Sequence, residues 1–303
     1  MLKSYLRLFL KGMAMGAADV VPGVSGGTIA FITGIYEELI SSISAINIHA
    51  VKLLMKGQFK NAWKYVNGNF LAVLFAGVFT SIMTLASLLT YLLEHFPIVV
   101  WSFFFGLVTA SIWLVGRTVK QWNVITVMSF ILGAVIAYVI TIIPASDGVS
   151  EPWYLILCGA LAICAMILPG ISGSFILLLL GAYSTVLAAV SERELSTIMY
   201  VGIGAILGLI SFTKALKWIF SNYYSTTIAV LSGFLLGSLN KLWPWKEVLE
   251  SFTKHEGTAK EEVVVITSIN LSPGPEWPVA LLCVCAGGVL VLLLERYGNR
   301  ERV

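Results

Sequence analysis

Residues 19–28 read Asp19-Val-Val-Pro-Gly-Val-Ser-Gly-Gly-Thr28, and residues 168–175 read Leu168-Pro-Gly-Ile-Ser-Gly-Ser-Phe175. Each sequence interrupts an apolar stretch of the chain, the first at 12–46 and the second at 153–189. Proline removes a backbone donor and its ring clashes with the preceding helical turn, whereas glycine tolerates left-handed backbone. We therefore predict that helices stop and restart at both places, so that each stretch is a re-entrant hairpin that enters a lipid bilayer and returns.

The rest of the 303-residue chain is strongly apolar, with 58% hydrophobic and 12% charged residues and a mean hydropathy of +0.91. An average soluble domain has roughly 25% charged residues. The 19 basic and 16 acidic side chains are too few to cover a globule of this size. The composition predicts a multi-pass membrane protein, and it excludes a soluble enzyme, a nucleic-acid-binding module and a secreted disulfide scaffold.

Six further apolar runs are each near the roughly 20 residues that a helix needs to span about 30 Å of hydrocarbon. We expect these transmembrane helices at about 70–93, 98–115, 124–143, 198–220, 226–242 and 279–294. The expected fold is therefore all-α. Each half of the chain would contain one hairpin followed by three spans.

The two interrupted stretches also form an internal repeat. Aligning Pro22 with Pro169 matches Gly23 with Gly170, Ser25 with Ser172, Gly26 with Gly173, Gly34 with Gly181 and Tyr36 with Tyr183. We divide the chain into a first repeat, 1–145, and a second, 146–303. A hairpin crosses the membrane zero times and three spans cross it an odd number of times, so the second repeat is predicted to be inverted relative to the first.

The basic residues support this topology. Cytoplasmic loops of membrane proteins are enriched in Lys and Arg. With the N-terminus in the cytoplasm, the loop that follows the first hairpin also falls there, and it carries Lys52, Lys56, Lys60 and Lys64 without any acid. Arg296, Arg300 and Arg302 then end on the same side. We expect a protein of the bacterial cytoplasmic membrane with both termini in the cytoplasm.

The two breaks are the candidate binding site. A broken helix exposes backbone N–H groups and the positive end of a helix dipole, which together suit a phosphate or a carboxylate. Inverted repeats with discontinuous helices are typical of secondary transporters. The alternative is that the small residues only permit close helix packing or a kink. The candidate substrate-binding residues at the breaks are Pro22, Gly23, Ser25, Gly26, Gly27, Thr28, Pro169, Gly170, Ser172, Gly173 and Ser174.

Three charged residues complete the candidate site. Asp19 lies inside an apolar run, where a carboxylate is costly and by default functional, so it is a candidate for proton or ion coupling; the alternative is a helix cap. Glu37 follows the repeated Tyr36 and is a second coupling candidate, or else a solvated interface residue. Arg117 is a candidate phosphate ligand, or else a side chain that extends to the membrane surface.

The stretch Gly12–Tyr36, the second motif Leu168–Tyr183 and the sequence Phe103-Phe-Phe-Gly-Leu107 resemble those of the polyprenyl-phosphate transporter family. The resemblance covers nearly the whole chain. It implies that the lipid substrate is undecaprenyl phosphate, moved from the outer to the inner leaflet and recycled for cell-wall and surface-polysaccharide synthesis. It implies no cofactor. No metal site is predicted and no oligomeric state is assigned.

Two other functions compete with this interpretation. Undecaprenyl-pyrophosphate phosphatases carry a similar Pro-Gly-x-Ser turn that is followed by an arginine, which would clamp a phosphate. Here Gly26 follows Ser25 and Gly173 follows Ser172, which argues against hydrolysis. A small-anion transporter or channel is the other alternative, and it would need a closed aqueous pore rather than an opening towards lipid.

Overall fold

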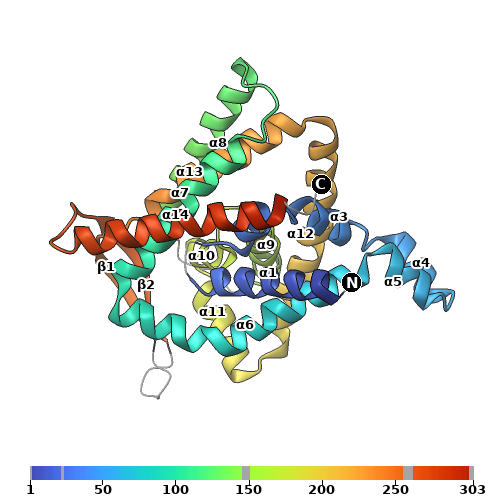
Figure 1. The fold of residues 1–303 in the computed structure, drawn as a ribbon. Helices are drawn as coiled ribbons and strands as arrows, with labels where there is room; N and C mark the ends of the chain where they lie inside the picture. Colours follow the sequence, from blue (N-terminus) through green and yellow to red (C-terminus); the bar gives the residue numbers. More distant parts are fainter. Residues whose placement is uncertain (1, 22–23, 145–150, 255–261, 300–303) are drawn as a thin grey trace.

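The computed structural model describes residues 2–21, 24–144, 151–254 and 262–299 (Figure 1). In the first half of the chain the helices are α1 (Leu2–Val20), α2 (Gly26–Ile32), α3 (Tyr36–Ser44), α4 (Ile48–Met55), α5 (Phe59–Tyr65), α6 (Gly68–His95), α7 (Pro97–Gly116) and α8 (Val124–Ile142). In the second half the elements are α9 (Pro152–Ile167), α10 (Gly173–Leu179), α11 (Tyr183–Glu192), α12 (Leu195–Asn222), α13 (Tyr224–Leu242), β1 (Lys246–Lys254), β2 (Glu262–Asn270) and α14 (Trp277–Asn299).

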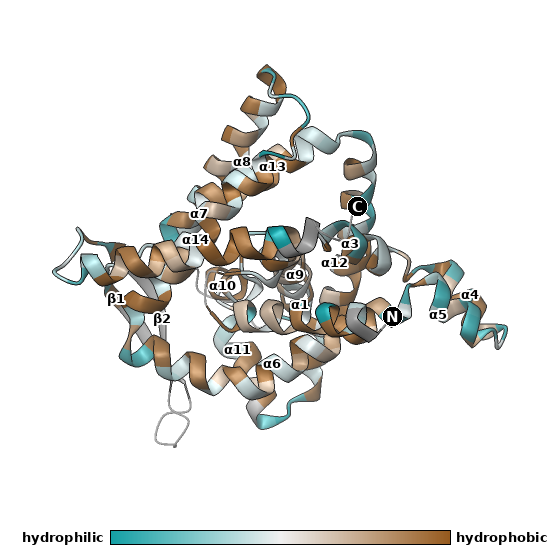
Figure 2. Cartoon of the chain, viewed as in Figure 1, coloured by the Kyte–Doolittle hydropathy of each residue, from teal (hydrophilic) through white to brown (hydrophobic). Residues whose placement is uncertain are grey.

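The six predicted spans correspond to α6, α7, α8, α12, α13 and α14. Within the described residues, five of these helices are long and apolar enough to cross a membrane, or seven segments qualify if each bent helix pair is one span. The five do not include α13, which contains several Ser, Thr and Gly residues and packs between α7 and α8. Apolar residues cover the outer faces of the long helices (Figure 2). The chain is therefore a mostly helical, multi-pass membrane protein.

The strands β1 and β2 correct the all-α expectation, because they pair as an antiparallel hairpin in the segment between α13 and α14. The second strand contains the run Val263-Val-Val-Ile-Thr267, and β-branched side chains of this kind favour extended backbone. The segment 47–69, predicted as a loop, also contains structure. It forms the short helices α4 and α5, and the side chain of Asn47 caps α4 by accepting from the backbone N–H groups of His49 and Ala50.

Each of the two interrupted stretches forms three helices rather than two arms. The first comprises α1, α2 and α3, and the second comprises α9, α10 and α11. The short middle helices end at Ile32 and Leu179, and each is followed two residues later by a glycine with positive φ, Gly34 at 71° and Gly181 at 64°. This left-handed backbone is accessible to glycine at little cost. The matched glycines of the repeat therefore mark the same kind of turn in both stretches.

Four helix pairs pack through glycine: α1 with α6, α9 with α12, α7 with α14, and α8 with α13. At each crossing, a Cβ atom added to the glycine would overlap a backbone carbonyl oxygen of the partner helix. Small residues let helix backbones approach closely inside a membrane, where packing supplies much of the association energy. The glycines at these contacts are Gly12 and Gly77, Gly159 and Gly204, Gly106 and Gly287, and Gly133 and Gly233.

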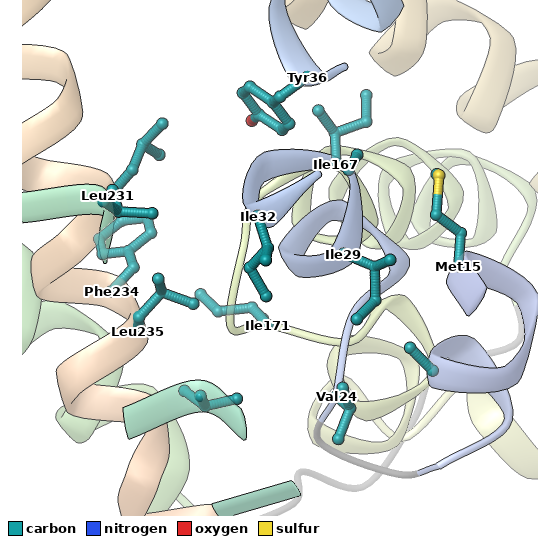
Figure 3. Close-up of a cluster of buried hydrophobic side chains, with 14 of the residues drawn as sticks. Met15, Val24, Ile29, Ile32, Tyr36, Ile167, Ile171, Leu231, Phe234 and Leu235 are labelled. Atoms are coloured by element: carbon teal, nitrogen blue, oxygen red, sulfur yellow. The ribbon is translucent and has the colours of Figure 1, made fainter. Parts of the chain in front are cut away.

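The buried core lies where the two interrupted stretches meet α13 (Figure 3). Figure 3 shows side chains from α2, from the turn between α9 and α10, and from α13 gathered around one another. The labelled members of this cluster are Met15, Val24, Ile29, Ile32, Tyr36, Ile167, Ile171, Leu231, Phe234 and Leu235. The helices thus place both breaks in the interior of the bundle.

A pair of glycines on α12 tests the packing. Gly204→Ala is expected to lower the unfolding temperature in detergent, because its Cβ would overlap the Ile156 carbonyl oxygen, and overpacking typically costs about 1–3 kcal/mol. Gly202→Ala is the matched control, since a Cβ there meets no atom within 4 Å. Alanine also improves helix propensity at both positions. Equal unfolding temperatures for the two variants would contradict the close contact of α9 and α12.

Candidate functional site

The first break lies between α1 and α2, and its residues 22 and 23, which include the candidates Pro22 and Gly23, lie outside the described part of the chain. Ser25 is the N-cap of α2, and its Oγ accepts a hydrogen bond from the backbone N–H of Gly27 at 3.1 Å. The N–H of Gly26 donates to Oδ1 of Asp19 at 2.7 Å. Two N–H groups at the start of α2 therefore already have acceptors within the chain.

The second break lies between α9 and α10. Pro169 and Gly170 are buried, and Gly170 has φ of 89°, in the region that favours glycine. Ser172 is the N-cap of α10, but its side chain caps no backbone N–H; instead its Oγ lies 2.8 Å from the Oγ of the exposed Ser174. A Cβ atom at Gly173 would lie 2.7 Å from the carbonyl oxygen of Ala162. This turn therefore carries a buried hydroxyl group, that of Ser172, next to the exposed one of Ser174, and it has glycine at its tight contacts.

The structure brings the two breaks together. Ser25 Oγ donates to the carbonyl oxygen of Met166 at 2.8 Å, and the N–H of Gly170 donates to Oγ1 of Thr28 at 3.0 Å. A Cβ at Gly27 would lie 2.5 Å from the carbonyl oxygen of Ile167. Both side-chain oxygens are fully buried, since Ser25 and Thr28 are each 0% exposed. The first break thus closes against the second through two hydrogen bonds that link residues far apart in sequence.

The buried link between the breaks can be tested with Thr28→Val, which keeps the shape of the side chain but removes the acceptor of the Gly170 N–H. An unsatisfied buried donor costs about 1–3 kcal/mol, so we expect a lower unfolding temperature in detergent. Thr80→Val is the control, because the Thr80 hydroxyl donates to the carbonyl of Ala76 within the same helix. A Thr28→Val protein as stable as wild type would show that the hydrogen bond contributes nothing.

Among the coupling candidates, Asp19 lies at the breaks and Glu37 does not. The Asp19 carboxylate is partly buried and is hydrogen bonded to Gly26. Glu37 is exposed at the start of α3 and lines a pocket of about 110 Å³ together with Lys217 and Phe220. The structure therefore places only the first of these two carboxylates in contact with the turns.

Arg117 is also away from the turns. Its guanidinium lies 3.9 Å from a carboxylate oxygen of Glu295 and 4.6 Å from the ring centroid of Trp113. Glu295 lies near the end of α14 and Trp113 near the end of α7, so neither partner belongs to the breaks. The contacts of Arg117 thus agree with the surface alternative for this side chain, and they do not place it beside the candidate phosphate site.

Two lysines near the second break are absent from the sequence-based candidates. The Nζ atom of Lys241 lies 4.7 Å from the ring centroid of Phe175, in the first turn of α10, and the Nζ atom of Lys246 lies 3.9 Å from that of Trp101. In the sequence both belong to a segment with more Glu than Lys, so composition gave no signal. The aromatic run Trp243-Pro-Trp245 between them was the sequence feature that could have indicated these lysines, because a cation is attracted to the face of an aromatic ring.

The described residues contain no group of three His, Cys, Asp or Glu side chains that could hold a metal ion.

Comparison with known proteins agrees with the resemblance of the motifs. Residues 15–260 match the family model described as undecaprenyl phosphate translocase-like. A polyprenyl-phosphate transporter of Vibrio cholerae is 45% identical over 98% of this chain and 98% of its own length. One of Staphylococcus aureus is 35% identical over 78% of this chain and 85% of its own. No solved structure matches the chain. The match over both breaks and most of the helices shows that this chain belongs to the undecaprenyl phosphate translocase-like family.

Proposed function

We propose that this protein carries undecaprenyl phosphate from the outer to the inner leaflet of the bacterial cytoplasmic membrane, where the lipid is recycled for cell-envelope synthesis. The family and both relatives are named for translocation or transport and not for catalysis. The observation that carries the proposal is the pair of broken helices that meet inside an apolar bundle through Ser25, Thr28 and Gly170. A lipid phosphate needs polar groups inside such a bundle for its head group, while its isoprenoid tail stays in lipid.

The glycine contacts support an inverted repeat of residues 1–145 and 146–303. Gly12 packs on the Leu74 carbonyl, and Gly159, its match in the repeat, packs on the carbonyl of Val201. On the partner helices, Gly77 packs on the carbonyl of Phe9, and its match Gly204 packs on the carbonyl of Ile156. The same correspondence relates the α7–α14 pair, where Gly106 packs on Val284, to the α13–α8 pair, where Gly233 packs on Phe130. One helix of each half therefore packs against the other half, α8 against α13 and α14 against α7. This arrangement suits two units that move against each other.

The arrangement of the ends supports a cytoplasmic position for both termini. Figure 1 shows the start of α1, the end of α14 and the helices α4 and α5 at one end of the molecule, with β1 and β2 at the opposite end. The lysines of α4 and α5 and Arg296 thus gather at the same end, as the positive-inside rule expects of the cytoplasmic side. In this orientation β1 and β2 face outside.

We propose that the phosphate binds at the two breaks when they separate. While the breaks are in contact, the Asp19 carboxylate accepts from the N–H of Gly26 and the Ser25 hydroxyl accepts from the N–H of Gly27. Separation of the breaks would free Ser25 from Met166 and Thr28 from Gly170, which offers hydroxyl and N–H donors to an anion. In this proposal, alternation between the halves carries the head group across the membrane.

The test is a leaflet-resolved assay of undecaprenyl phosphate in proteoliposomes with and without the protein. We expect faster loss of the lipid phosphate from the outer leaflet when the protein is present. A parallel arm with inorganic phosphate measures the competing function, a small-anion transporter. Transport of inorganic phosphate without any movement of the lipid would refute the proposal and establish that alternative.

A further inference from the structure

Two lysines share one site at the end of α13. Lys241 is in the last turn of this helix, and Lys246 opens β1. The Nζ atom of Lys246 donates a hydrogen bond to the backbone carbonyl oxygen of Lys241, so the Lys246 ammonium lies beside the end of α13. The first ammonium lies over the ring of Phe175 and the second over that of Trp101, on α7. Three separate parts of the chain, α7, α10 and α13, thus converge on a pair of positive charges.

No carboxylate neutralises this pair within the described residues. Both lysines are partly buried, and neither forms an ion pair in that part of the chain. Burial, and to a smaller extent the positive charge of Lys241, lowers the pKa of Lys246 to about 7. Removing two like charges from water without a counter-ion is unfavourable, and the aromatic rings compensate only part of the cost. An anion at this position would relieve it.

A further donor lies unused between the two lysines in sequence. The Nε1 atom of Trp245 is buried and has no hydrogen-bond partner in the structure. Buried donors are normally paired, so an unpaired one is a feature that a ligand would explain. Trp243 packs against the same ring, with the two centroids 5.5 Å apart. The segment that carries the two lysines thus also contains a buried donor without a partner, which lies beside Gly274.

The lysine site adjoins the second break. Gly170 of that break lies against Ser238 of α13, because a Cβ at Gly170 would be 2.9 Å from the Ser238 Oγ. Lys241 follows Ser238 by three residues, which is about one helical turn. Phe175, under the Lys241 ammonium, directly follows the exposed Ser174. The lysine site thus adjoins the turn that carries Ser172 and Ser174.

We propose that Lys241 and Lys246 form the entry site for the phosphate head group of a polyprenyl phosphate lipid, before the head group reaches the two breaks. This inference rests on the proposed function, and it adds the place at which the substrate is first captured. In the proposed orientation the site faces the outer leaflet, which supplies the lipid. The ring surfaces of Trp101 and Phe175 give the site an apolar wall, which suits a phosphate that carries an isoprenoid chain.

The experiment measures equilibrium binding to the full chain in nanodiscs by tryptophan fluorescence. The probes are undecaprenyl phosphate, undecaprenol as its uncharged counterpart, and inorganic phosphate. We expect Lys241→Met and Lys246→Met each to weaken binding of undecaprenyl phosphate about tenfold, and the double variant to weaken it further, since charge-assisted bonds to phosphate are strong. Lys246→Arg keeps the charge and is expected to bind within about threefold of wild type. Lys60→Met, on the exposed face of α5, is the control.

The outcomes separate this inference from the proposed function. Wild-type affinity in the double methionine variant, in a protein that still moves the lipid, would overturn the lysine site and leave the function standing. If Lys246→Arg lost as much affinity as Lys246→Met, the lysine site would also be overturned. A site that binds the phosphate through a positive charge should accept arginine in place of lysine. Equal binding of undecaprenyl phosphate and undecaprenol would show that the phosphate is not recognised. A wild-type protein that neither binds nor moves undecaprenyl phosphate would refute the proposed function itself.

Discussion

Gly26→Val is expected to abolish transport of undecaprenyl phosphate while the protein is still produced and inserted in the membrane. A Cβ atom at this position would lie 2.5 Å from a carboxylate oxygen of Asp19, so a branched side chain displaces that carboxylate and fills the space in front of the N–H groups of α2. If the phosphate binds there, valine removes the site. A loss of about 3 kcal/mol of binding is already more than a hundredfold.

Gly173→Val is expected to have the same effect through the second break, where the added Cβ would lie 2.7 Å from the Ala162 carbonyl oxygen. The rate of lipid movement in proteoliposomes measures both variants. Gly202→Val on α12 is the control, because a Cβ there has open space. The unfolding temperature in detergent reports whether each variant still folds. Wild-type transport in either variant at the breaks would refute the model in which both turns hold the phosphate.

The parts of the fold that depend on local sequence are the parts that could be predicted. Apolar runs of sufficient length gave the six long helices to within a few residues, because the length of a span is fixed by the bilayer. The Pro-Gly sequences correctly located the breaks. Gly34 and Gly181, which the repeat aligns, both adopt positive φ. The strands β1 and β2 were not predicted, because the pairing of two strands depends on contacts between segments that composition does not encode.

The contacts between the breaks could not be predicted, because they join residues about 140 positions apart. The sequence shows that Ser25 and Thr28 carry hydroxyl groups, but not that Ser25 donates to the Met166 carbonyl oxygen or that Thr28 accepts from the Gly170 N–H. It suggests open donors at the first break, whereas the structure satisfies those of Gly26 and Gly27 inside the chain. Lys241 is a similar case, since only the three-dimensional structure reveals its position above Phe175.

Asp19 occupies the position that an anionic ligand would take. Its carboxylate accepts the Gly26 N–H at 2.7 Å, and among the described residues no basic side chain pairs with it. A phosphate that approaches this turn must displace the carboxylate, and two negative charges at one donor repel each other. Protonation weakens the carboxyl group as an acceptor and removes its charge, so the phosphate competes more successfully. This exchange is a physical route by which a proton could be coupled to substrate binding.

Asp19→Asn should therefore remove the dependence of transport on pH or on an ion gradient, because the amide is permanently uncharged and nearly the same size as the carboxyl group. The measurement compares rates of undecaprenyl phosphate movement in proteoliposomes at several pH values, with and without an imposed gradient. Glu37→Gln is the matched variant for the second coupling candidate, which is exposed and lines a pocket with Lys217. We expect it to keep the wild-type dependence. If transport by Asp19→Asn depended on pH or the gradient as wild type does, Asp19 would not be the coupling residue. If only Glu37→Gln lost this dependence, the coupling would be assigned to Glu37.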